Sequence, residues 1–197
     1  MLPPLTATHS ALPTDSREDI VERLLTTTHP SPNQPWLAKI IASWLTGNSV
    51  LPDFIGLEPE QFKALCQFYF ADADISTKAV SGIVPDYRRM PEIDDLIQLL
   101  QAYSRTRDQE NDWIISIIVI ACMGLDHLWE DLGLWQRSEL SALISYNFPQ
   151  LAESNSKNMK WKKFIYKKLC DAEGIYLCRA PSCEVCTDYA KCFGPED

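Results

Sequence analysis

The sequence predicts an all-α fold, a single domain of about six to seven helices followed by an irregular, cysteine-rich C-terminal tail that binds metal. Three observations lead to this prediction. Apolar residues recur three and four positions apart over most of the chain, which is the pattern of amphipathic helices. No series of alternating apolar and polar residues indicates strands. Four of the seven cysteines are gathered within residues 178–192, after the last helical segment.

Seven segments carry the helical pattern, and caps and breakers set their limits. They are residues 15–27, 36–45, 59–70, 91–104, 110–129, 137–148 and 155–174. Asp15 or Ser16 can cap the first helix, and Pro59 suits the first turn of the third. The proline-containing segment 29–35 is expected to separate the first two helices, and residues 71–90 are expected to form a connector.

The segment 110–129 contains the β-branched run IISIIVI, which by composition suits a strand. Its apolar pattern is longer than a typical strand, and no turn residue interrupts it, so the sequence favours one buried helix. The richest apolar run, WIISIIVIACMGL at 113–125, is too short to cross a bilayer. We therefore expect no membrane partner.

Three parts are expected along the chain: a disordered N-terminal segment at 1–14, a helical domain at 15–174 and a four-cysteine metal-cluster tail at 175–197. The first part lacks the basic and apolar regions of a signal peptide. We therefore expect a cytoplasmic protein. In that compartment a tight cysteine cluster more often binds metal or acts in redox chemistry than forms disulfides.

The charge of the chain argues against nucleic acid as a partner. The formal net charge is −9, whereas nucleic-acid-binding domains are typically basic. From Lys157 onward eight basic residues accompany six acidic ones, so the basic minority lies beside the cysteines. The sequence contains no phosphate-binding glycine loop, catalytic triad or paired-carboxylate site that would indicate an enzyme.

The cysteine tail, CRAPSCEVCTDYAKC, has the spacing C-x4-C-x2-C-x5-C over Cys178, Cys183, Cys186 and Cys192. Thiolates are soft ligands that suit zinc and iron–sulfur clusters. Structural zinc sites usually pair two C-x2-C units across a longer spacer, and this tail has one such unit. The C-x4-C-x2-C part equals the plant-type ferredoxin spacing, in which the fourth cysteine is distant. The spacing favours an iron–sulfur or mixed metal cluster, with structural zinc and thiol redox chemistry as alternatives.

Three blocks of sequence, in this order, resemble the NifQ family. They are GLDHLWEDLGL (124–134), MKWKKFIYKKLC (159–170) and EGIYLCRAPSCEVC (173–186), followed by CFG (192–194). The resemblance covers roughly residues 35–194, and the four-cysteine motif is its hallmark. The NifQ family takes part in biosynthesis of the iron–molybdenum cofactor of nitrogenase, and its members are regarded as molybdenum donors.

The resemblance implies a cofactor, a ligand set and partners. The cofactor would be an iron–sulfur cluster that contains molybdenum, with a [4Fe–4S] cluster as the molybdenum-free form. Its ligands would be Cys178, Cys183, Cys186 and Cys192. Molybdate would be the metal source, and the nitrogenase cofactor scaffold complex and the nitrogenase iron protein would be the receivers. The protein would be a carrier and not an enzyme. The alternative is a zinc-stabilised helical protein-interaction module.

Five residues outside the motif are further candidates. Lys160, Lys163 and Lys167 should share one face of a helix, either as a solvated face or as a patch for an acidic partner or molybdate. His127 is a candidate auxiliary ligand, although a lone histidine near a helix end more often has a structural role. Cys170 is a candidate fifth thiol near the site, and otherwise a core residue.

The remaining cysteines and a group of carboxylates are assigned ordinary roles. Cys66 and Cys122 lie in apolar helical patterns and are expected in the core. Asp126, Glu130 and Asp131 are expected to solvate a helix end, because charged side chains are rarely buried.

Overall fold

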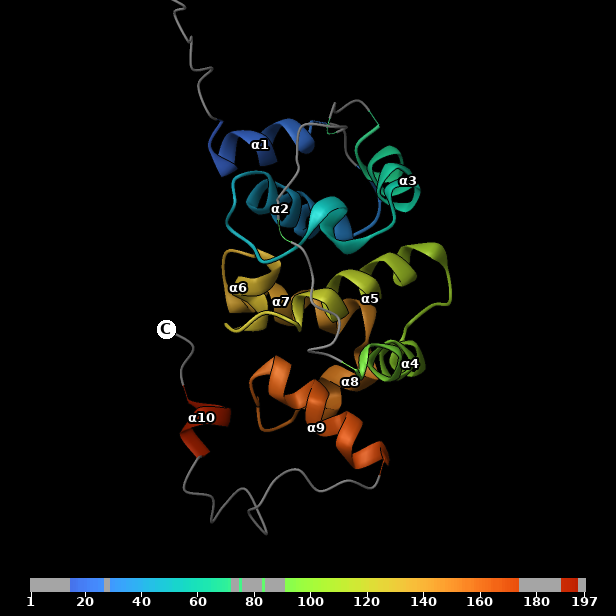
Figure 1. Ribbon diagram of the computed structural model, residues 1–197, viewed down its shortest axis with the longest axis vertical. Coiled ribbons are helices and arrows are strands. Elements are labelled where there is room, and N and C mark those ends of the chain that lie inside the picture. Colours follow the sequence, from blue (N-terminus) through green and yellow to red (C-terminus); the bar gives the residue numbers. More distant parts are fainter. Residues whose placement is uncertain are drawn as a thin grey trace, which may run out of the picture.

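The computed structural model describes residues 15–26, 29–71, 75, 83, 91–173 and 189–194. Within these ranges the chain is helical and contains no strand, which confirms the all-α prediction (Figure 1). The elements in chain order are α1 (Arg17–Leu24), α2 (Asn33–Leu45), the short η1 (Asp53–Gly56), α3 (Pro59–Tyr69), α4 (Ile93–Tyr103), α5 (Gln109–Ala121), α6 (Leu128–Leu132), α7 (Arg137–Asn147), α8 (Pro149–Ser154), α9 (Trp161–Glu173) and α10 (Tyr189–Phe193).

The helices are arranged in three tiers (Figure 1). Helices α1, α2 and α3 form one end, with α1 packed on α2. Helices α5, α6 and α7 form the middle tier, which contacts the first through the pairs α2–α7 and α3–α5. Helices α4, α8 and α9 form the other end, and α4 packs against α5, α8 and α9.

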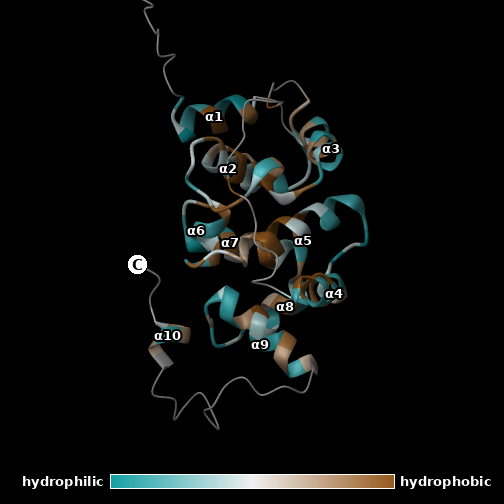
Figure 2. Cartoon of the chain, in the orientation of Figure 1, coloured by the Kyte–Doolittle hydropathy of each residue, from teal (hydrophilic) through white to brown (hydrophobic). Residues whose placement is uncertain are grey.

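The middle of the core is the apolar helix α5. Every side chain from Trp113 to Ala121 except Ser116 is less than 10% exposed, and Figure 2 shows hydrophobic residues along this helix. A helix that is apolar on all sides must be surrounded by other elements. The structure therefore confirms that the β-branched run forms a buried helix, in which tertiary packing outweighs the strand propensity of isoleucine.

The Glu110 side chain at the start of α5 connects the middle tier to the first tier through hydrogen bonds. Glu110 accepts hydrogen bonds from the hydroxyls of Ser31 and Tyr69 and from Asn33 Nδ2, the last at 2.8 Å. Asn33 also exchanges hydrogen bonds of 3.0 and 2.7 Å with Asn147 of α7. Burial and Glu110 raise the pKa of Tyr69 well above its ordinary value, so its hydroxyl stays a donor.

The prediction of one helix over 110–129 is wrong in its second half. Helix α5 ends at Ala121, and a separate helix, α6, begins at Leu128. Gly124 explains the break. Its backbone lies directly against the buried Asp131 carboxylate, where a Cβ atom would overlap the carboxylate. The sequence alone does not reveal a contact between positions seven residues apart across a turn.

Two other helix starts differ from the prediction. Helix α2 begins at Asn33, inside the expected breaker, because Pro35 occupies the first turn, where a missing N–H has no helical partner to lose. Helix α9 begins at Trp161 rather than near 155, because Asn155 closes a loop with hydrogen bonds of 2.8 and 2.9 Å to the backbone of Met159. Asn158 in this loop has a φ of 53°, which is incompatible with a right-handed helix.

The number of helices exceeds the predicted six to seven, since ten α-helices occur in the described part of the chain. The additional ones, α6, α8 and α10, have only five or six residues each. Helix α10 lies within the segment that was expected to be irregular. None of the helices in the described ranges has the length and apolar content needed to cross a bilayer.

Candidate functional site

One of the four motif cysteines lies in the described part of the chain. Cys192 belongs to α10, whereas Cys178, Cys183 and Cys186 lie outside the described residues. The four-cysteine ligand set therefore stays a prediction. Among the residues that the structure describes, no group of three or more histidine, cysteine, aspartate and glutamate side chains could hold a metal ion.

Cys192 is held against the start of α9. Its carbonyl oxygen accepts a hydrogen bond of 2.8 Å from the Lys160 backbone N–H, and its side chain packs against the edge of the core. The Lys163 ammonium donates to the Cys192 sulfur at 3.7 Å. The structure thus fixes the backbone of Cys192 through Lys160 and its sulfur through Lys163.

A pocket of about 290 Å³ opens next to this cysteine. It lies between the loop that precedes α6, the start of α9 and helix α10. Its lining residues are Leu125, Asp126, His127, Leu128, Lys160, Lys162, Lys163 and Lys191. The lining thus includes four lysines and one acidic residue, Asp126. The pocket is therefore basic, although the chain as a whole is acidic.

A buried ion pair holds one wall of the pocket. Lys162 pairs with Asp131, whose side chain is 0% exposed, and also donates to the carbonyl oxygens of Gly124 at 3.1 Å and Asp126 at 2.8 Å. These contacts connect α9 to the loop at 124–127, which no regular secondary structure supports. Lys162 therefore positions the wall, and Asp131 balances its charge.

The expectation that Asp131 is a solvated residue at a helix end is wrong. Burial raises the pKa of the Asp131 carboxyl above its ordinary value, while the hydrogen bond and the charge of Lys162 oppose this shift. The neighbouring Cys122 is buried, as the sequence predicts, and burial raises the pKa of its thiol to about 12. Cys66 is half-buried, and burial likewise raises the pKa of its thiol to about 12.

The structure brings together some of the other predicted residues and not all of them. Lys160, Lys163 and His127 line the same pocket. Lys167 does not line it and pairs with Asp171 at 2.5 Å, one turn further along α9. Cys170 is half-buried near the end of α9, and the described residues give it no metal-ligating neighbours in a group of three.

Two lysines of the pocket were missed by the sequence analysis. Lys162 was expected on no particular face, and only its contact with Asp131 reveals its position. Lys191 comes directly before the motif residue Cys192, which was a usable signal, since neighbours of a ligand share its surroundings.

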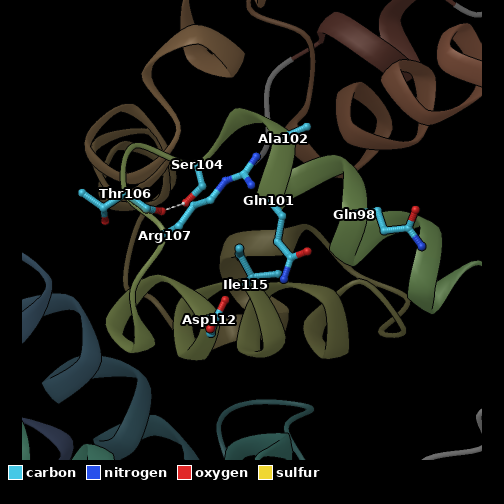
Figure 3. A pocket seen from close by; sticks show the side chains of 8 residues that line it. All are labelled: Gln98, Gln101, Ala102, Ser104, Thr106, Arg107, Asp112 and Ile115. Carbon is cyan, nitrogen blue, oxygen red and sulfur yellow. Dashed lines mark hydrogen bonds between the residues drawn. The ribbon is translucent and has the colours of Figure 1, made fainter.

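Another pocket, of about 370 Å³, lies where α4, the following turn and α5 meet (Figure 3). Its lining includes Gln98 and Gln101 of α4, and Ser104 donates a hydrogen bond of 2.7 Å to the Thr106 carbonyl in the turn. The described residues that line it include one cation, Arg107, and one carboxylate, and neither a cysteine nor a histidine. It therefore offers neither the cysteine nor the lysine-rich lining found at the pocket beside α10.

Comparisons with known proteins agree with the features of the sequence. A model of the NifQ family matches residues 36–194. Protein NifQ of Azotobacter vinelandii is 41% identical over 178 residues, which make up 85% of this chain and 91% of that protein. Protein NifQ of Klebsiella pneumoniae is 32% identical over 168 residues, 82% of this chain and 99% of that protein.

A protein NifQ homolog of Sinorhizobium fredii is 46% identical over 111 residues, which make up 56% of this chain and 48% of that protein. No solved structure matches the chain significantly. The matches to the Azotobacter vinelandii and Klebsiella pneumoniae proteins extend over most of the chain. The range 36–194 that the family model matches includes all four motif cysteines.

Proposed function

The chain belongs to the NifQ family, and on this premise we propose that it carries a molybdenum-containing iron–sulfur cluster and donates molybdenum to nitrogenase cofactor synthesis. Family membership implies a role in the biosynthesis of the iron–molybdenum cofactor. To this role the proposal adds three points: the bound cluster, the function as a carrier and the proteins that receive the metal.

The observation that carries the proposal is the C-x4-C-x2-C-x5-C motif inside the range that matches the family. Four thiolates are the donor set that iron–sulfur clusters prefer. Cys192 supports this assignment, because it is held at the edge of the core with the Lys163 ammonium 3.7 Å from its sulfur. A nearby cation offsets part of the negative charge that cysteine-ligated clusters carry.

In this proposal Cys178, Cys183, Cys186 and Cys192 hold the cluster, which supplies a sulfur-rich site for molybdenum. The chain acts as a carrier and not as an enzyme, takes its metal from molybdate and works in the cytoplasm. Its receivers are the nitrogenase cofactor scaffold complex and the nitrogenase iron protein. His127 lines the pocket near Cys192 and is a candidate auxiliary ligand or partner contact.

The test is a measurement of metal and acid-labile sulfide after strictly anaerobic purification from cells grown with molybdate. We expect iron, sulfide and molybdenum in the native protein and a loss of all three in Cys183→Ala. The matched control is Cys66→Ala, which removes a half-buried thiol outside the motif from the amphipathic helix α3 and should leave the metal content unchanged.

Two results would contradict the proposal. Zinc without sulfide, unchanged by exposure to air, would favour the zinc-stabilised interaction module. Equal metal content in the native protein and Cys183→Ala would show that the motif does not hold the cluster.

A further inference from the structure

We propose that Lys163 tunes the cluster that the chain carries. Its ammonium donates a hydrogen bond to the sulfur of Cys192 when this cysteine is a ligand, and the contact raises the reduction potential of the cluster. The inference deepens the proposed function and rests on it for the presence of the cluster. It uses the position of one ligand, Cys192, and does not depend on where the other three cysteines lie.

The backbone around Cys192 is fixed against α9 and the core. The Cys192 carbonyl oxygen accepts a hydrogen bond of 2.8 Å from the Lys160 backbone N–H. Cys192 and the neighbouring Phe193 also pack against the edge of the hydrophobic core. The sulfur is therefore held beside the first turn of α9, which is the turn that carries Lys163.

The lysines of α9 differ in what their ammonium groups contact. Lys162 and Lys167 each pair with an aspartate. Lys163 instead donates to the Cys192 sulfur at 3.7 Å, and none of the carboxylates that the structure describes pairs with it. The Lys163 side chain is exposed, so packing does not force this contact. The sulfur is therefore the acceptor toward which the Lys163 charge is directed.

The turn that carries Lys163 is held in place by the neighbouring residue, Lys162. The Lys162 ammonium pairs with the buried Asp131 and donates to two backbone carbonyl oxygens of the loop before α6, at 3.1 and 2.8 Å. These contacts fix the start of α9 relative to the middle tier. Because Cys192 is bound to the same turn, the contact between Lys163 and the sulfur is set by the core of the protein.

A donor at a ligand sulfur has a known effect on an iron–sulfur cluster. Hydrogen bonds to the sulfurs are among the factors that set the reduction potential of such clusters. Reduction adds an electron to a cluster that is already negative, and a nearby cation stabilises the more negative state more strongly. The Lys163 contact should therefore raise the reduction potential, so that the cluster stays reduced at applied potentials where it would otherwise be oxidised.

A redox titration of the loaded protein, followed by electron paramagnetic resonance, tests this inference. The native protein and each variant are loaded anaerobically with iron and sulfide. At a fixed applied potential, the ratio of reduced to oxidised cluster should be about tenfold smaller in Lys163→Met, the lower end of the usual effect of removing a partner of a metal ligand. For a one-electron couple this is a fall of about 59 mV. Lys163→Arg should lie closer to the native protein, because its guanidinium can still donate.

Two matched controls separate the hydrogen bond from the charge. Lys160→Met removes a charge from the same pocket but keeps the backbone N–H that bonds to Cys192. Lys168→Met removes a charge from the same helix at a position that lies over the Phe164 ring and outside the pocket. The ratio should stay within about twofold of the native value in Lys168→Met, because a distant charge is largely screened. Lys160→Met should shift the ratio less than Lys163→Met does, since it retains the hydrogen bond to the sulfur.

Three results would overturn the proposal. They are an unchanged potential in Lys163→Met, an equal fall in Lys160→Met, and a failure of Lys163→Met to take up the iron and sulfide that the native protein takes up. The second would assign the effect to the charge of the pocket, and the third would make Lys163 necessary for loading.

The outcome is separable from the test of the cluster itself. A native protein that takes up no iron and sulfide would contradict the proposed function together with this inference. A native protein that carries the cluster, with the same reduction potential in Lys163→Met, would contradict this inference alone.

Discussion

The buried pair between Lys162 and Asp131 gives the sharpest prediction for stability. Lys162→Met keeps most of the length of the side chain and removes its charge. We expect the free energy of unfolding at pH 7 to fall by about 3–5 kcal/mol, the usual cost of leaving one member of a buried ion pair without its partner. At this chain length the midpoint of thermal unfolding should fall by about 6–20 °C.

The surroundings of the pair support a value of this size. The Asp131 side chain is 0% exposed and that of Lys162 is 18% exposed, so water cannot take the place of the missing partner. The Asp131 Oδ1 atom has no hydrogen-bond partner among the described residues, which leaves Lys162 on Oδ2 as the main support of the charge. The variant also loses the hydrogen bonds from Lys162 to the Gly124 and Asp126 carbonyls.

A second lysine of α9 provides the matched control. Lys167 pairs with Asp171 on the same helix, but these side chains are 45% and 48% exposed. Lys167→Met should therefore cost only about 0.3–0.5 kcal/mol, as exposed pairs four residues apart in a helix do. Urea unfolding followed by circular dichroism, supported by thermal melts, measures both variants under the same conditions.

The effect of Lys162→Met should depend on pH with a defined sign. Burial raises the pKa of Asp131 in the folded protein, and Lys162 limits the shift, so the variant should have the higher pKa. A carboxyl whose pKa is higher in the folded state binds protons more tightly there, so lowering the pH favours folding. The free energy of unfolding therefore gains more from acidification in the variant than in the native protein. The difference in stability between the two proteins should narrow from pH 7 to pH 4.

Two results would refute this reasoning. If the free energy of unfolding of Lys162→Met at pH 7 lies within about 1 kcal/mol of that of the native protein, the pair contributes no more than an exposed salt bridge does. A gap that widens on acidification would mean that Asp131 does not carry the buried charge.

Three other predictions concern the core. Gly124→Ala should destabilise the protein by about 1–3 kcal/mol in urea unfolding, because its Cβ would displace the buried Asp131 carboxylate; an unchanged midpoint would contradict this. Glu110→Ala should cost about 2–4 kcal/mol by the same assay, since three donors lose their shared acceptor. Cys66 and Cys122, whose pKa values burial raises to about 12, should resist iodoacetamide at pH 8 in the native protein and react in urea, as peptide mass spectrometry would show.

Helix positions were predictable where an apolar stripe spans several turns. The segment 137–148 matches α7 to within one residue, and Trp161, Phe164, Ile165 and Leu169 are buried along α9 as their spacing predicts. The breaks were not predictable, because they depend on contacts between distant positions. The end of α5 follows from a glycine pressed against Asp131, and the wall that follows it is fixed by Lys162, 31 residues beyond that carboxylate.

The candidate site was predictable in part for a related reason. The sequence identified Cys192, His127, Lys160 and Lys163, and the structure places the last three around one pocket. The sequence analysis grouped Lys167 with Lys160 and Lys163 because residues three and four positions apart share one face of a helix. This spacing does not show which turns of that face line a pocket. Which turns of a helix line a pocket depends on the segments that pack against that helix. Here α10 packs against the first turn of α9, so only that turn lines the pocket.

Adjacent lysines at the start of α9 have separate tasks because neighbouring positions of a helix point in different directions. Lys162 points inward and fixes the loop at 124–127, whereas Lys163 points to Cys192. The pocket wall and the motif cysteine are therefore held by the same turn of one helix. Under the proposed function, α9 thus positions one ligand, Cys192, and the preceding part of the tail supplies the other three thiolates.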